Sequence, residues 1–85
     1  MGVHKTEQFE EQLKALLAGF SRLDDAIGSV EYLLSEYPDS GISTAVPGLY
    51  VFRTRLPDAG NLVRFSIFYL YDGKDVWFKE LRRAP

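Results

Sequence analysis

The sequence has 85 residues, with 10 basic and 12 acidic side chains and a formal net charge of −2 at pH 7. An apolar fraction of 46% is enough for one modest core, so we expect a single domain over residues 1–85 and not a disordered chain. The absence of cysteine excludes disulfide scaffolds, thiolate zinc sites and thiol nucleophiles, and the lack of a long apolar run or signal-peptide pattern predicts a cytoplasmic protein without membrane association.

The charge is divided unevenly along the chain. Residues 1–47 carry three basic and eight acidic side chains, a net charge of −5, whereas residues 48–85 carry seven basic and four acidic side chains, a net charge of +3. This asymmetry has two interpretations: the second half meets an anion, or a helical half and a sheet simply carry solvated charges. The negative total by itself favours the second interpretation, because nucleic-acid binders are usually basic.

The first half of the chain predicts two amphipathic helices. Residues 2–5 are compatible with a short strand, after which Thr6 is a suitable helix N-cap and Gly19 a suitable end. A second helix is expected to start at Ser21 and to end before Pro38. Apolar side chains recur at helical spacing in both segments, at Phe9, Leu13, Leu16, Leu17 and Phe20, then at Leu23, Ile27, Val30, Leu34 and Tyr37.

The second half predicts three strands. Residues 39–48, rich in Gly, Ser, Thr and Pro, are expected to form a loop before a strand over residues 49–56. Residues 57–61 predict a hairpin loop, residues 62–71 the longest strand, and Asp72-Gly73 the turn into a strand over residues 76–81.

This order of elements predicts an α+β fold: a short N-terminal strand, then a two-helix antiparallel hairpin packed on a three- to four-stranded antiparallel meander. In the longest strand the odd positions Phe65, Ile67 and Tyr69 form an apolar face that the helices should cover. Arg64 and Ser66, at even positions, are then expected on the uncovered face of the sheet.

The arginines of these strands are the main candidates for functional residues. Arg64 is either a phosphate ligand or one member of an ion pair on the open face. Arg53 and Arg55 share one face of their strand, where they either follow a nucleic-acid backbone or protect a sheet edge with charge. For Arg82 and Arg83 a solvated chain end is the simpler interpretation, and His4 reads as an exposed histidine. No metal, nucleotide or catalytic-triad motif is present in the sequence.

The chain resembles the RelE/ParE toxins of bacterial toxin–antitoxin systems, most closely the HigB- and RelE-like branch. The residues that carry the likeness are PGLYVFRTRL, then VRFSIFYLYDG and a final basic strand, placed after a short strand and two helices. The likeness covers nearly the whole chain in the order and spacing of its elements. Arg64 matches the arginine that opens the family's central strand, and Phe9 matches the aromatic residue of its first helix.

The resemblance implies a metal-independent mRNA endonuclease that needs no cofactor, acts on the ribosome to inhibit translation, and is held inactive by a cognate antitoxin protein. Arg64 would hold the phosphate, while Arg82, Arg83 and Lys79 would stabilise charge or act as acid. Arg53 and Arg55 would follow the RNA backbone, and Trp77 would bind RNA by base stacking or pack in the core. Because the sequence stops at Pro85, a catalytic tyrosine in a longer tail is expected to be missing.

Two other functions are compatible with the same residues. The acidic balance and the short end favour a non-catalytic binding module of the same fold, either a ParE-like gyrase poison or an inactive homologue that binds an antitoxin. A small α+β domain that forms a homodimer through its sheet is the third interpretation.

Overall fold

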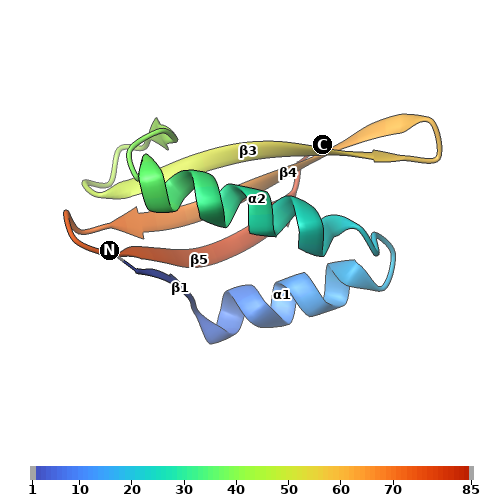
Figure 1. Ribbon diagram of the computed structural model, residues 1–85, viewed down its shortest axis with the longest axis horizontal. Helices are drawn as coiled ribbons and strands as arrows, with labels where there is room; N and C mark the ends of the chain where they lie inside the picture. Colours follow the sequence, from blue (N-terminus) through green and yellow to red (C-terminus); the bar gives the residue numbers. More distant parts are fainter. Residues whose placement is uncertain (1, 85) are drawn as a thin grey trace.

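A computed structural model describes residues 2–84 of the chain, so Pro85 lies outside the described part. Two helices lie on one face of a five-stranded sheet, which makes an α+β fold (Figure 1). The elements in chain order are β1 (Val3–Lys5), α1 (Glu7–Leu17), α2 (Leu23–Glu36), β2 (Ile42–Ser43), β3 (Leu49–Asp58), β4 (Asn61–Tyr71) and β5 (Val76–Arg83). Among the residues described, no helix combines the length and hydropathy that a membrane crossing requires.

The sheet is mixed, which corrects the prediction of a purely antiparallel meander of three to four strands. Its strand order is β1-β5-β4-β3-β2, and β1 pairs with β5 in parallel while the other pairs are antiparallel. The N-terminal strand is anchored beside β5 because Thr6 donates its backbone N–H and its hydroxyl to the Phe78 carbonyl, at 3.1 and 2.8 Å. Lys5 Nζ also lies 3.0 Å from Glu31 Oε1 of α2, and this hydrogen bond raises the pKa of Lys5.

The helices begin and end close to the predicted positions, with one correction. Thr6 caps α1 as expected, since its hydroxyl oxygen accepts the Phe9 N–H at 3.3 Å. Helix α2 begins at Leu23 and not at Ser21; its N-cap is Arg22, which makes no side-chain capping bond. The acidic pair Asp24 and Asp25 fills its first turn instead, where carboxylates interact favourably with the helix dipole.

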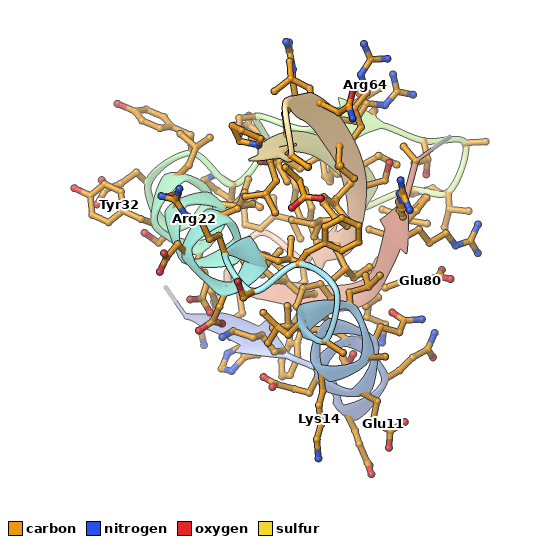
Figure 2. The ribbon with its side chains drawn as sticks, turned by 90° about the vertical axis from the view of Figure 1, so that its right-hand side faces the viewer. Glu11, Lys14, Arg22, Tyr32, Arg64 and Glu80 are labelled. Atoms are coloured by element: carbon orange, nitrogen blue, oxygen red, sulfur yellow. The ribbon has the colours of Figure 1, made fainter. Side chains whose placement is uncertain are left out.

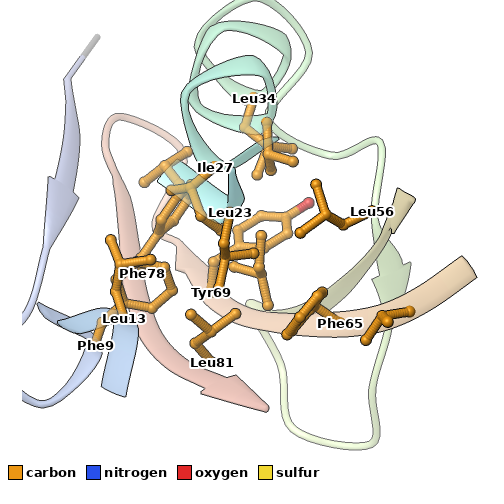
Figure 3. Close-up of a cluster of buried hydrophobic side chains, with 14 residues drawn as sticks. Phe9, Leu13, Leu23, Ile27, Leu34, Leu56, Phe65, Tyr69, Phe78 and Leu81 are labelled. Atoms are coloured by element: carbon orange, nitrogen blue, oxygen red, sulfur yellow. The ribbon is translucent and has the colours of Figure 1, made fainter. Parts of the chain in front are cut away.

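The core lies between the helices and one face of the sheet (Figure 3). Phe65, Ile67 and Tyr69 of β4 are fully buried, which confirms the predicted covered face, and Arg64, the residue before Phe65, is exposed. The helical stripes meet this face through their most buried members, which are Phe9, Leu13, Leu23, Ile27, Val30 and Leu34.

The hairpin between β3 and β4 is longer than predicted. Pro57 and Asp58 belong to β3, and Asp58 pairs with Asn61, so the loop consists of Ala59 and Gly60 alone. Both loop residues have positive φ, 49° and 84°, as in the two-residue turns that match the twist of a hairpin. The exposed tip of this hairpin extends beyond the helices (Figure 1).

A β-bulge in β5 decides which face its last residues take. Tyr69 pairs with Phe78 and Phe68 pairs with Glu80, so Lys79 is an extra residue opposite β4. After the bulge, Leu81 points into the core and Arg82 to the opposite face. Simple alternation from Phe78 would have placed Arg82 on the helix side.

Gly41 is packed against β3 and β4 just before β2, and we expect Gly41→Ala to destabilise the fold. A Cβ at this position would lie 2.6 Å from Tyr69 Oη and 2.9 Å from the Val51 carbonyl oxygen. The Gly41 N–H also donates to Tyr69 Oη at 3.0 Å, a bond that the displaced backbone would lose. Overpacking of this kind costs about 1–3 kcal/mol. Urea unfolding should show the loss. Gly28→Ala should instead stabilise α2, because Gly28 is at an exposed position of the helix and the added Cβ meets no neighbouring group within 4 Å. Equal unfolding midpoints for the two variants would contradict the prediction.

Candidate nucleic-acid interface

Arginine side chains gather on the face of the sheet that the helices do not cover, which we call the open face. In the strand register Arg55 is directly opposite Arg64, and one step along the same face Arg53 is opposite Ser66, which is opposite Arg82. Directly opposed side chains of antiparallel strands lie on the same face about 4.5–5.5 Å apart at Cβ. The fold therefore brings four arginines from three strands into two adjacent rows.

These residues line a hollow with a volume of about 640 Å³. Its lining includes a fifth arginine, Arg83, and the five together are called the arginine cluster below. Figure 2 shows Arg64 on the opposite side of the molecule from Glu11 and Lys14 of α1. The full lining is Arg53, Thr54, Arg55, Arg64, Phe65, Ser66, Phe68, Arg82, Arg83 and Ala84.

The positive charge of the cluster is largely uncompensated. Arg82 Nε lies 2.6 Å from Glu80 Oε1, but within residues 2–84 no carboxylate lies within 4.0 Å of the other four guanidinium groups. Like charges directly opposite each other, such as Arg55 and Arg64, destabilise a sheet. A bound anion would relieve this repulsion, and guanidinium groups match phosphate oxygens with paired hydrogen bonds.

Arg82 is held in place by two neighbours on the open face. Besides the Glu80 contact, its guanidinium carbon lies 5.3 Å from the centre of the Phe68 ring. Glu80 and Phe68 are opposite each other in the strand register, so both belong to the row next to Arg82. The guanidinium is thus oriented over the sheet, although its side chain is 62% exposed.

Arg83 approaches the hollow from the helix side. It is opposite Phe65 in the register, and its guanidinium carbon lies 5.2 Å from the centre of the Phe20 ring. Phe20 in turn packs edge-on against Phe65, with ring centres 5.3 Å apart. Ala84 closes the end of the strand by donating its N–H to the Arg64 carbonyl at 2.8 Å. The cluster therefore extends around the end of β5.

Two of the predicted site residues lie elsewhere. Lys79 is the exposed extra residue of the bulge and does not line the hollow. Trp77 is on the open face opposite Leu70, and its ring stacks on His4 with centres 4.2 Å apart. The structure thus brings together Arg53, Arg55, Arg64, Arg82 and Arg83 and leaves Lys79 and Trp77 outside this hollow.

Phe68 is the residue that the sequence reasoning missed. It had no assigned role, yet it lines the hollow and contacts Arg82. The signal that could have identified it is its position, because Phe68 continues the even-numbered face of β4 that starts with Arg64 and Ser66.

The described lining of the hollow is rich in positive charge. Among the described residues that line it, arginine is the only ionisable type, and the remaining polar side chains are Ser66 and Thr54. Within the described residues no group of three or more His, Asp or Glu side chains has the geometry of a metal site. Searches against known protein families, curated proteins and solved structures found no match for this chain.

Proposed function

We propose that the arginine cluster binds the phosphate backbone of RNA. The observation that carries this proposal is the convergence of five arginines from three strands on one hollow, four of them without a carboxylate within 4.0 Å among the described residues. An isolated surface arginine contributes little to binding, but a group that faces one hollow can contact several phosphates of the same strand. The negative net charge does not oppose this, because the acidic residues of α1 and α2 lie in the other layer.

We further propose that the chain is a toxin of the RelE/ParE type that inhibits translation by cutting mRNA and is neutralised by a cognate antitoxin. Support for this step comes from the resemblance of the segments around Arg64 and from the position of Arg64 on the open face, in one hollow with four other arginines. Arg64 would hold the phosphate under attack and Arg82 would stabilise its developing charge.

A non-catalytic binding module of the same fold is the second candidate. The observation in its favour is the lining of the hollow by residues 2–84, none of which is a histidine, lysine or carboxylate able to transfer a proton at neutral pH. Such a module would bind RNA or a protein partner and leave the RNA intact.

One pair of measurements separates these candidates. Fluorescence anisotropy with labelled RNA should show that Arg64→Ala weakens binding about tenfold, because Arg64 is exposed and a charge-assisted hydrogen bond at the weak end of its range is worth about 1.5 kcal/mol. Arg22→Ala is the matched control, because Arg22 is exposed in the helical layer and does not line the hollow (Figure 2). Equal affinity of both variants and the wild type would overturn RNA binding at this site.

Cleavage is then tested with purified protein and an mRNA undergoing translation. Cleavage by the wild type that Arg64→Ala abolishes supports the toxin proposal. Binding without cleavage would assign the chain to the non-catalytic module.

A further inference from the structure

The open face continues beyond the arginine cluster as a band of apolar side chains. In the register Val51 is opposite Phe68, and in the next row Leu49 is opposite Leu70, which is opposite Trp77. These five residues, called the apolar band below, lie on the face away from the helices, where the one stacking partner among the described residues is the His4 ring of β1 beside Trp77. Trp77 is 38% exposed and the other four are half-buried by their neighbours in the sheet.

Charge and apolar surface follow each other along the strands. Two rows of arginines are followed by the Phe68 row and then by the Trp77 row. Successive residues on one face of a strand are about 6.6 Å apart, so each row lies within one short step of the next. Contact between the two regions is direct, because the Arg82 guanidinium lies over the Phe68 ring at 5.3 Å.

We infer that the apolar band is a platform for the bases of single-stranded RNA whose phosphates lie on the arginine cluster. The inference rests on the RNA binding proposed above and adds the form of RNA that is recognised. Unpaired bases stack on aromatic rings and on guanidinium planes, and the Arg82–Phe68 pair offers both kinds of surface beside the phosphate-binding arginines.

A duplex does not fit this surface equally well. Its bases are already stacked and paired inside the helix, so it would place charged phosphates and sugars against Phe68, Leu70 and Trp77. Removing water from those charges without a partner is unfavourable. A single strand instead offers its bases to the apolar band and its phosphates to the arginines.

Trp77 provides the readout, because it is the sole tryptophan of the chain. Titration with a short single-stranded RNA should change its intrinsic fluorescence, whereas the same sequence as a duplex, and inorganic polyphosphate, should leave the fluorescence unchanged. Competition anisotropy should also rank the single strand as the tightest of the three ligands. Equal affinity for all three, with no change in fluorescence, would overturn the inference while leaving anion binding at the arginine cluster intact.

The variant that tests the platform is Phe68→Leu, which keeps an apolar side chain and removes the ring. It should weaken single-strand binding about five- to hundredfold, the range for loss of one stacking contact, and leave polyphosphate binding unchanged. Tyr32→Leu, at a tyrosine of α2 that is 73% exposed, should change neither affinity. If Phe68→Leu weakens the binding of single-stranded RNA and of polyphosphate equally, the ring only positions Arg82. That result would overturn the inference that the apolar band binds bases.

Other occupants of the apolar band give different results. If a second copy covers the band, sedimentation will detect a dimer that Phe68→Leu dissociates, and that result would overturn the inference. Failure of every RNA to bind would overturn both the inference and the proposed function. If Arg64→Ala weakens RNA binding but the protein does not prefer single strands, the inference is overturned and the proposed RNA binding stands.

Discussion

Replacing Arg53, Arg64 and Arg82 together with alanine is expected to weaken RNA binding by about a hundred- to a thousandfold at low salt. The three side chains come from three different strands and face the same hollow, so one RNA backbone can contact all of them. For a single strand each phosphate contact contributes about 0.7 to the slope of log affinity against log salt. The triple variant should therefore lose about 2 from that slope.

The control for this prediction replaces Lys14, Arg22 and Lys74, which changes the net charge by the same amount. All three are exposed and none lines the hollow. Anisotropy titrations at several salt concentrations should show a nearly unchanged slope for this control. The same slope for both triple variants would mean that binding depends on net charge and not on the cluster. Because removal of the cluster also removes like-charge repulsion, the first variant should unfold at the same or a slightly higher temperature.

Replacing Phe65 with alanine is expected to lower the free energy of unfolding by about 3–5 kcal/mol. Phe65 is fully buried in the central strand, and Phe20 packs edge-on against it from the segment that joins the two helices. Its loss would leave a cavity beneath the arginine cluster. Since small domains are stable by only about 5–15 kcal/mol, this loss is a large fraction of the total stability.

Guanidinium unfolding followed by circular dichroism measures this loss. Tyr32→Ala serves as the comparison, because Tyr32 is 73% exposed and its removal should change stability by less than about 0.5 kcal/mol. Indistinguishable midpoints for Phe65→Ala and Tyr32→Ala would contradict the assigned core. RNA binding of Phe65→Ala should recover at low temperature if the fold persists there, since Arg64 and Ser66 point to the other face.

Local patterns in the sequence were enough to predict both helices and the three long strands. Helical and alternating spacing of apolar residues can be recognised over ten or more residues, as in the stripe of α2 and the odd positions of β4. No local sequence pattern indicates the pairing of β1 with β5, because it joins Val3 to Val76 and depends on long-range packing. Strand β2 consists of Ile42 and Ser43 alone, which is too short for any periodicity.

The candidate site was predicted residue by residue but not as one arrangement. Face counting placed Arg64 on the open face and grouped Arg53 with Arg55, in agreement with the structure. Alternation could not place Arg82 and Arg83, because the extra residue Lys79 exchanges the faces of all residues after it. The strand register then decided which arginines lie opposite each other, and that register depends on the two-residue turn at Ala59 and Gly60.

The parallel pairing of β1 with β5 has a consequence for how the protein is made. Residues 3–5 are synthesised well before their partner strand, residues 76–78, because the whole of both helices, β2, β3 and β4 lies between them in the sequence. The sheet therefore cannot be completed until residues 76–78 are available, and contacts of such large sequence separation slow folding. Since Arg82 and Arg83 follow those residues in β5, we expect the nascent chain to lack an assembled arginine cluster until β5 has been synthesised and has paired with β4.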